Sequence, residues 1–231
     1  MSDQLCVITG VGPGTGSALV RKFAERYRVV MIARDERRLQ DLAAQVPGSI
    51  PLACDVADVV ALQSTLAHIA GLGAPRVVIH NAVGGGAGDI LAIDPATLNR
   101  NFQINTMSLL HLIQAFAPAM IEAGEGAILA TGNTAAYRGR SNFVSFAPTK
   151  AAQRIMLESA ARTLGPQGIH VAYVAIDAAI DVPWTRKALP DHPDEFFANP
   201  ADIASECFHI AHQPRSTWTF DVVIRPFGEQ W

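Results

Sequence analysis

Short runs of β-branched and apolar residues alternate with longer helical patterns along the whole chain. Strands are predicted for LCVIT (5–9), RVVMIA (28–33), IPLACD (50–55), RVVIHNA (76–82), GAILATG (126–132), IHVAYVAI (169–176) and TFDVVIR (219–225). Helices are predicted for 15–27, 35–46, 97–122 and 145–164. Strands that alternate with helices are typical of a parallel sheet covered on both faces. We therefore predict a doubly wound α/β fold, with residues 1–231 forming a single domain.

The composition excludes several classes of function. A formal net charge of -3 provides no basic surface for a phosphate backbone, so we expect no nucleic-acid partner. No uninterrupted apolar run approaches the roughly 18 residues that cross a bilayer, and the first ten residues lack the pattern of a secretion signal. We expect a cytoplasmic protein without a membrane partner. Its three cysteines, Cys6, Cys54 and Cys207, are expected to be reduced and buried.

A glycine-rich turn follows the first predicted strand. The sequence TGVGPGTG places Thr9, Gly10, Gly14 and Gly16 in a TGxxxGxG pattern, with Thr15 between the last two glycines. Glycines let the backbone approach a pyrophosphate closely, and the N-terminus of the following helix offers unpaired N–H groups. The pattern predicts a dinucleotide site; the alternative is a tight structural turn without a ligand.

The end of the second predicted strand bears on which dinucleotide would bind. Ala33 stands where a carboxylate would contact a ribose 2′-hydroxyl, and Arg34 follows it. A guanidinium pairs well with a 2′-phosphate, so the sequence favours NADP(H) over NAD(H). The alternative is that Arg34 is solvated and that Asp35 only caps the next helix.

Three strand ends together resemble the short-chain dehydrogenase/reductase (SDR) superfamily: TGVGPGTG, then ACDVAD, then HNAVG. The resemblance is collinear over nearly the whole chain and implies a Rossmann-type sheet with strand order 3-2-1-4-5-6-7. It also implies that Asp55 and Val56 lie against the adenine, and that Asn81 and Ala82 support the cofactor. Val83 departs from the family's Asn-Ala-Gly. A homodimer or homotetramer is expected on the same grounds.

The catalytic set that the resemblance implies is incomplete. Asn105 and Lys150 match the family's helix asparagine, which relays protons through water, and its lysine, which holds the nicotinamide ribose. Phe146 in SFAPTK stands at the position of the tyrosine acid, and Asn133 at that of the serine. Phenylalanine has no proton to give, and the loss of a positioned general acid typically lowers a rate by roughly 10²- to 10⁴-fold. The Asn133 amide could still stabilise a developing oxyanion.

Three other side chains could replace the missing general acid. Ser145 precedes Phe146 but on a helix would point about 100° away from it. Tyr137 lies four residues beyond Asn133, in a loop that borders the substrate pocket of the resembling family; the alternative is aromatic packing. His80 is interpreted as a packing residue at a strand end rather than as an acid.

The segment VPWTRKALPDHPDEFFANP (182–200), with its four prolines, predicts a lid over a cleft, and its Trp184 and Phe196 constrain substrate size only loosely. It follows IDAAIDVPW, which stands where the resembling family has PGxIxT. Ile180 keeps its place, so its backbone could hold the nicotinamide amide, whereas Val182 replaces a threonine. Asp177 and Asp181 are interpreted as turn residues rather than as paired catalytic carboxylates.

His209 and His212 lie three residues apart on a predicted helix, a spacing that could bind a metal. No third ligand is close in sequence, so we interpret them as a solvated helix face and predict no metal site.

Two functions stay open at this point. The first is an oxidoreductase that transfers a hydride between NADP(H) and an unidentified small carbonyl or alcohol, with an atypical or weakened proton donor. The second is a catalytically inactive NADP(H)-binding sensor or partner subunit. The second is motivated by Phe146, Asn133 and Val182, which together replace the family's tyrosine, serine and threonine.

Overall fold

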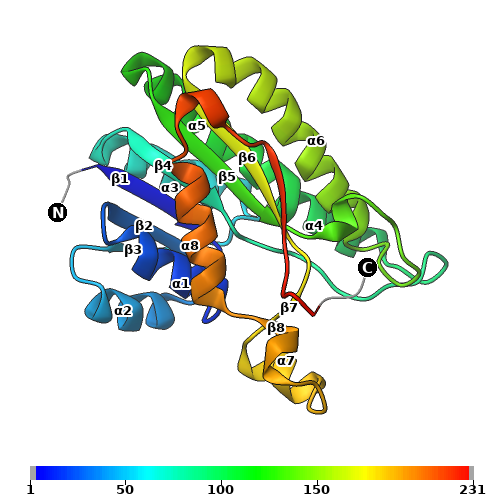
Figure 1. The fold of residues 1–231 in the computed structure, drawn as a ribbon. Coiled ribbons are helices and arrows are strands. Elements are labelled where there is room, and N and C mark those ends of the chain that lie inside the picture. The colour runs from blue at the N-terminus through cyan, green and yellow to red at the C-terminus, as the bar shows by residue number, and fades with distance from the viewer. Residues whose placement is uncertain (1–3, 229–231) are drawn as a thin grey trace.

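Seven parallel strands form the central sheet of the computed structural model, which describes residues 4–228 (Figure 1). They are β1 (Leu5–Thr9), β2 (Arg28–Ala33), β3 (Ile50–Ala53), β4 (Pro75–His80), β5 (Gly126–Gly132), β6 (Ile169–Ile176) and β9 (Asp221–Ile224). Their order, β3-β2-β1-β4-β5-β6-β9, confirms the predicted order, because β9 is the seventh predicted strand. Residues 1–3 and 229–231, the ends of the predicted domain, lie outside the described residues.

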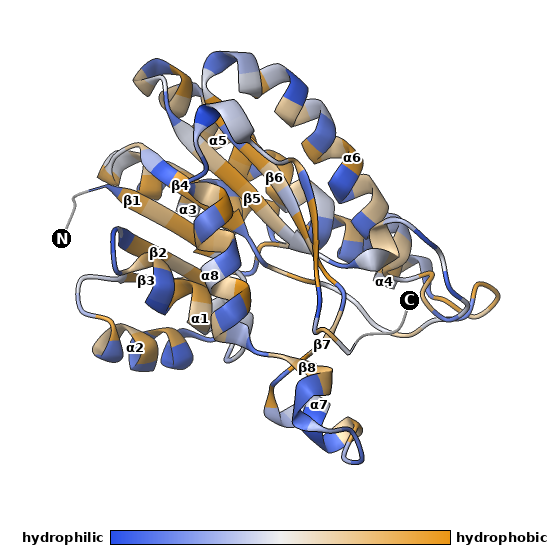
Figure 2. Cartoon of the chain, viewed as in Figure 1, coloured by the Kyte–Doolittle hydropathy of each residue, from blue (hydrophilic) through white to orange (hydrophobic). Residues whose placement is uncertain are grey.

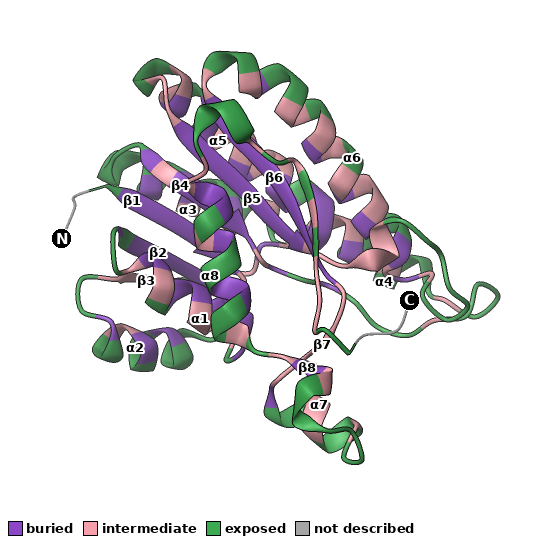
Figure 3. Ribbon diagram, in the orientation of Figure 1, coloured by how far each residue is buried: buried purple, intermediate pink, exposed green. Residues whose placement is uncertain are grey.

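Helices cover both faces of the sheet and make two apolar cores. α1 (Thr15–Phe23), α2 (Glu36–Gln45) and α8 (Pro200–Ala211) pack on one face. α3 (Val59–Leu72), α5 (Ser108–Ala123) and α6 (Ala147–Leu164) pack on the other. The strands between them are apolar and mostly buried, as Figures 2 and 3 show. Parallel strands that are buried on both faces have continuous apolar sequences. This burial explains why the strands could be predicted from the sequence.

The predicted helix over 97–122 runs from Pro95 to Ala123 but changes its winding in the middle. α4 (Pro95–Phe102) continues into a π-helical turn (Gln103–Met107) and then into α5. Turns of this kind inside α-helices are frequent at functional positions. This one contains Asn105, which is fully buried.

By length and composition this 29-residue helix is apolar enough to cross a bilayer, and it is the one such helix within residues 4–228. Polar residues such as Asn99, Arg100 and Asn101 interrupt its apolar sequence, so no such helix is apparent from an uninterrupted apolar run. Half of its most apolar window is buried inside the protein, and Leu112, Phe116 and Met120 belong to the core beneath the sheet. In this structure it is a core helix of the domain.

α6 begins two residues later than predicted. Phe146 lies just outside the helix, with φ −124° and ψ −54°, and Ala147 is its first residue. Pro148 follows in the first turn, where its fixed φ suits a helix start and its missing N–H is not needed. The backbone at Ser145 and Phe146 is therefore loop rather than helix.

α8 packs on α1 through an aromatic cluster that includes His212. The Tyr27 hydroxyl contacts His212 Nε2 at 2.7 Å, and His212 Nδ1 contacts the Phe208 carbonyl at 2.6 Å. The prediction of a solvated face holds for His209, which is exposed, but is wrong for His212, which is half-buried with both ring nitrogens engaged. The three cysteines are free and buried, as predicted.

Candidate functional site

An open cleft of about 1150 Å³ lies at the carboxyl ends of the strands, where open α/β sheets bind their ligands. Most of the predicted cofactor residues line it: Gly10, Gly14, Thr15, Gly16, Arg34, Asp55, Val56, Asn81, Ala82 and Ile180. Thr9 and Lys150 do not line the cleft; both are buried beneath it. The sequence therefore located the cleft, and the cofactor contacts predicted for Thr9 and Lys150 stay predictions.

The glycine turn has no room for larger side chains. Gly10 has φ +72°, and a Cβ there would collide with the backbone of Ala82. A Cβ on Gly16 would lie 2.5 Å from the Gly10 carbonyl oxygen. The turn therefore requires glycine at both positions, for backbone conformation at the first and for close approach at the second.

The start of α1, at the floor of the cleft, leaves polar groups without protein partners. No side chain caps this helix at Gly14, and the buried Thr15 hydroxyl has no hydrogen-bond partner within residues 4–228. Helix N-termini of this kind favour anions because unpaired N–H groups and the helix dipole act together. The residues present thus fit the pyrophosphate of a dinucleotide.

Arginines gather where the cleft passes the end of β2. Arg34 is exposed, lines the cleft and forms no ion pair within the described part of the chain. Asp35 caps α2 by accepting from the Arg38 N–H at 3.0 Å, which confirms the capping interpretation. Arg38 also lines the cleft, a position that the sequence analysis missed because it lies a full helical turn beyond Arg34.

Asp55 is held by a partner from a distant part of the chain. Its carboxylate accepts from the Ala57 N–H at 3.0 Å and from Arg100 Nη2 at 2.7 Å. Partial burial acts to raise the pKa of Asp55, but these hydrogen bonds and the Arg100 charge outweigh it and hold the pKa below its ordinary value. A pairing across 45 residues leaves no local signal in the sequence.

Asn81 ties the glycine turn to the neighbouring strand. Its Nδ2 donates to the Gly10 carbonyl at 2.8 Å, and its Oδ1 accepts from Thr131 Oγ1 at 2.8 Å. These contacts fix the Asn81 side chain beside the glycine turn, and its support of a cofactor stays a prediction.

His80 is a buried connector, in line with its interpretation as a packing residue. Its Nδ1 contacts Thr9 Oγ1 at 2.9 Å, and its Nε2 contacts the Ile104 carbonyl at 3.1 Å. Burial, with a smaller contribution from the Lys150 charge, lowers the pKa of His80 to about 3. The ring is therefore neutral at pH 7, donates from Nε2 to Ile104 and accepts at Nδ1 from the Thr9 hydroxyl.

Asn105 uses its whole side chain to hold the loop after β4. Its Oδ1 accepts from the Gly84 N–H at 2.9 Å, and its Nδ2 donates to the Gly84 carbonyl at 2.7 Å. The same Nδ2 also donates to Thr149 Oγ1 at 2.7 Å. Both N–H donors of this amide are therefore engaged by protein groups, and its oxygen accepts one hydrogen bond, from Gly84.

Lys150 lies beside Asn105 and is almost completely buried. Its Nζ donates to the Thr131 carbonyl at 3.2 Å and to Gln153 Oε1 at 3.0 Å. Burial lowers the pKa of Lys150 to about 7. The structure thus brings the two predicted catalytic residues together, but beneath the cleft and among protein partners.

Phe146 lies between the glycine-rich loop after β4 and the Lys150 side chain, close to both. A Cβ on Gly85 would lie 3.3 Å from Phe146 Cδ2, and Lys150 Nζ lies 5.8 Å from the centroid of the ring. Next to Phe146, the fully buried Ser145 donates to the Gly86 carbonyl at 2.5 Å. The helical geometry expected for Ser145 is wrong, but the hydroxyl is committed to the backbone and does not replace the acid.

Tyr137 points away from the cleft toward β9. Its hydroxyl donates to Asp221, whose carboxylate also accepts from Arg154 Nε at 2.7 Å. Burial and the Asp221 carboxylate raise the pKa of Tyr137 well above its ordinary value, and its ring packs edge-on against Tyr173. These contacts support the packing interpretation of Tyr137.

Asn133 caps the short 3-10 turn Thr134–Ala136, because its Oδ1 accepts from the Ala135 N–H at 3.1 Å.

Asp177 and Asp181 make separate local contacts. Asp177 accepts from Thr134 Oγ1 at 2.7 Å, and Asp181 pairs with Arg186 at 2.7 Å.

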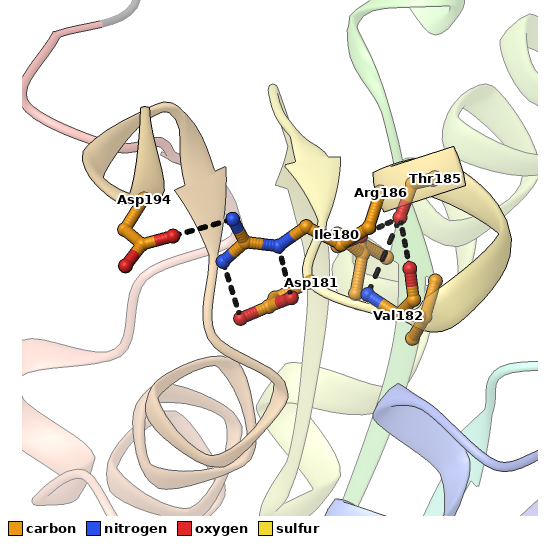
Figure 4. Close-up of polar contacts among 6 residues, drawn as sticks. All are labelled: Ile180, Asp181, Val182, Thr185, Arg186 and Asp194. Carbon is orange, nitrogen blue, oxygen red and sulfur yellow. Dashed lines mark hydrogen bonds and ion pairs between the residues drawn. The ribbon is translucent and has the colours of Figure 1, made fainter. Parts of the chain in front are cut away.

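The predicted lid over 182–200 contains α7 (Pro183–Ala188) and is joined to the preceding segment by two short parallel strands, β7 (Ala179–Ile180) and β8 (Phe197–Ala198). Arg186 clamps it: its guanidinium binds Asp181 at 2.7 Å and Asp194 at 2.6 Å (Figure 4). The guanidinium also lies 4.0 Å from the centroid of the Phe197 ring.

The start of this segment rests on the glycine turn. Val182 is buried, and its Cγ1 would lie 2.7 Å from a Cβ placed on Gly14. Thr185, which the sequence analysis missed, lines the cleft and donates its hydroxyl to the Ile180 carbonyl (Figure 4). A hydroxyl is thus present beside the position where Val182 replaces the family's threonine.

A doubly wound parallel sheet whose glycine turn opens a polar, arginine-rimmed cleft defines a dinucleotide-binding α/β protein. Residues 4–191 match the family model described as short chain dehydrogenase, and the chain belongs to that family. It is an oxidoreductase family whose members bind NAD(P).

Relatives and solved structures agree with this assignment. The 7alpha-hydroxysteroid dehydrogenase of Escherichia coli (strain K12) is 27% identical over 99% of this chain and 94% of its own. Carbonyl reductase (NADPH) 2 of Sus scrofa is 27% identical over 90% of this chain and 89% of its own. The crystal structure of a metagenomic short-chain oxidoreductase in complex with NADP superposes with a TM-score of 0.84 at 27% identity, covering 99% of both chains.

Proposed function

We propose that this protein transfers a hydride between NADP(H) and an unidentified small carbonyl or alcohol, with a weakened proton donor. The observation that carries the proposal is the start of α1, where the unpartnered Thr15 hydroxyl and the uncapped N–H groups face an open cleft. Bound NADP(H) would supply or accept the hydride. The cofactor named for the pig relative and the NADP complex of the similar crystal structure support the choice of NADP(H).

Arg34 and Arg38 would hold the 2′-phosphate that distinguishes NADP(H) from NAD(H). Both line the same end of the cleft, and Arg34 has its full charge available because it forms no ion pair within residues 4–228. Asp55 and Val56 would contact the adenine, and the backbone at Ile180 would contact the nicotinamide amide. Thr185 would steady that backbone through its hydrogen bond to Ile180.

Proton transfer is the step that these residues support least. Phe146 has no ionisable proton, and the Lys150 ammonium is buried and donates to the Thr131 carbonyl and to Gln153. Asn133 would bind the substrate oxygen if its amide turned from its capping contact. We therefore expect turnover slower by roughly 10²- to 10⁴-fold than in a member with a positioned acid.

A second function is favoured by Phe146, which has no ionisable group and packs on the glycine-rich loop near the buried Lys150. In this alternative the protein binds NADP(H) without turnover and acts as a sensor or as the partner subunit of an active enzyme. A cytoplasmic location and a homodimeric or homotetrameric state are part of either proposal.

Binding and turnover separate these functions. NADPH and NADH are titrated while nucleotide fluorescence and melting temperature are recorded, since a ligand of the native state raises stability by mass action. Turnover of NADPH is then measured with a panel of aldehydes and ketones. Oxidation of NADPH above the solution background, reduced by Lys150→Ala, supports the oxidoreductase. Binding without turnover supports the sensor or partner, and failure of both nucleotides to bind would overturn both.

A further inference from the structure

Gln153 forms a bridge inside the protein between Lys150 and the π-helical turn. It is fully buried and lies three residues beyond Lys150 on α6. Its Oε1 accepts from Lys150 Nζ at 3.0 Å, and its Nε2 donates to the Asn105 carbonyl at 2.6 Å. Both ends of the amide are therefore engaged, which fixes its orientation.

The Asn105 carbonyl, like the side chain of this residue, is a group that could hold a relay water. A π-helical turn changes the backbone hydrogen-bond pattern locally and leaves carbonyls available to side chains or water. Here the carbonyl is taken by Gln153, and the Asn105 side chain is taken by Gly84 and Thr149. Both side-chain donors of Asn105 and one lone pair on each of its two oxygens are thus engaged by protein groups.

An amide cannot pass a proton along this path. The Gln153 oxygen that faces Lys150 carries no hydrogen to return, and the nitrogen at the other end keeps its hydrogens at any ordinary pH. A proton lost from Lys150 therefore cannot be replaced through Gln153.

We propose that Gln153 is a positioning residue that takes the place of a relay water and isolates Lys150 from proton exchange through Asn105. This inference rests on the proposed function and adds to it, because it assigns the weak proton supply to two changes rather than one. Phe146 takes the place of the acid, and Gln153 blocks the path by which an acid at that position would be reprotonated.

The first experiment restores the acid with and without the bridge. Phe146→Tyr is compared with Phe146→Tyr/Gln153→Ala, in which a water-sized space opens beside Lys150. The expected result is NADPH oxidation on the order of tenfold or more faster in the double variant, within the range of a restored acid–base path. The gain should appear in kcat, with a changed pH profile and little change in KM.

Two matched controls separate the relay from packing. Phe146→Tyr/Gln153→Met fills the same space without hydrogen bonds and without water, so it should show no gain. Phe146→Tyr/Gln114→Ala changes an exposed glutamine on α5 and should match Phe146→Tyr. The inference would be overturned if Phe146→Tyr and its two double variants with Gln153→Ala and Gln153→Met oxidised NADPH at equal rates, or if none of the three showed turnover.

A second measurement does not depend on activity. Gln153→Ala in the otherwise unchanged protein should increase the rate at which acetic anhydride acetylates Lys150, followed by mass spectrometry, while Gln153→Met should not. Lys22 and Lys187, which lie elsewhere, serve as internal controls, and melting temperatures show that each variant is folded. Unchanged labelling of Lys150 in a folded Gln153→Ala protein would contradict the inference. Failure of NADPH to bind the unmodified protein would remove the proposed function but not this result.

Discussion

The Lys150 ammonium lies 5.8 Å from the centroid of the Phe146 ring and donates hydrogen bonds to the Thr131 carbonyl and to Gln153. This buried position should make the stability of the protein depend on pH. Because the pKa of Lys150 is about 7 in the folded protein instead of 10.5, the unfolded chain binds one more proton between these pH values. The free energy of unfolding should therefore rise with pH across this window, by up to about 5 kcal/mol.

Lys150→Met removes this titration. We therefore expect the free energy of unfolding of Lys150→Met, relative to that of the unmodified protein, to be highest at low pH and to decrease as the pH rises. Urea unfolding from pH 6 to 10 measures both values. Lys187→Met, an exposed change on α7, should give a constant difference. A difference for Lys150→Met that does not vary with pH would show that the lysine keeps its ordinary pKa when folded.

His80 should make the protein sensitive to acid. Its pKa is about 3 when folded and 6.5 ordinarily, so the unfolded chain takes up the extra proton in between. Stability is fully present above pH 6.5 and should fall as the pH approaches 3, by up to about 5 kcal/mol. His80→Gln should cost roughly 1 to 3 kcal/mol at pH 7 through its lost partners but flatten the acid dependence. Urea unfolding at pH 7, 5 and 4 tests this, with the exposed His209→Gln as comparison.

Arg34 should set the preference between the two dinucleotides. Arg34→Ala is expected to weaken NADPH binding by roughly 10- to 100-fold, because a charge-assisted contact with the 2′-phosphate is lost, and to leave NADH binding nearly unchanged. Arg37→Ala is the matched control, since Arg37 is an exposed neighbour that does not line the cleft. Equal weakening of both nucleotides would assign Arg34 a general electrostatic role instead.

Gly10 and Gly12 offer a paired test of the glycine turn. Gly10→Ala should destabilise the protein by roughly 2 to 4 kcal/mol, because φ is +72° and the new methyl group would meet the Ala82 backbone. Gly12→Ala should be tolerated, because a Cβ there has nothing within 4 Å. Unfolding free energies measured with urea decide the matter; similar losses at both positions would mean that the turn differs from this geometry.

The Arg186 clamp should control how firmly the lid segment is held. Arg186→Ala releases Asp181 and Asp194 from their shared partner, so we expect faster chymotryptic cleavage within 182–200 and weaker NADPH binding. Lys187→Ala removes a neighbouring charge without breaking the clamp and should change neither readout. Cleavage at an unchanged rate in Arg186→Ala would show that other contacts hold the segment.

Local patterns predicted the architecture and most of the cleft. The strand runs, the glycine turn at Gly10 and the capping residue Asp35 depend on nearby sequence, and each lies where the sequence indicated. The start of α6 was predicted two residues early because Ser145 and Phe146 continue the apolar spacing, whereas the backbone enters the helix only at Ala147, just before Pro148.

Features that depend on distant partners could not be predicted in the same way. Three such features join separate elements of the fold: the pairing of Arg100 with Asp55, the contact of Lys150 with the Thr131 carbonyl, and the bridge from Gln153 to Asn105. A glutamine inside a helical pattern looks like an ordinary surface residue until its neighbours are known. His212 was misjudged for the same reason, since its partner Tyr27 lies 185 residues away.

The π-helical turn at Gln103–Met107 also has a consequence for helical phase. A wider turn accommodates about one residue more than an α-helical turn, so α5 is rotated by roughly 100° relative to a uniform continuation of α4. Arg100 can therefore face Asp55 at the cleft while Leu112 and Phe116 still face the core. Deletion of a single residue within this turn would restore uniform winding and misalign one end of the helix, whereas most substitutions there would leave the phase intact.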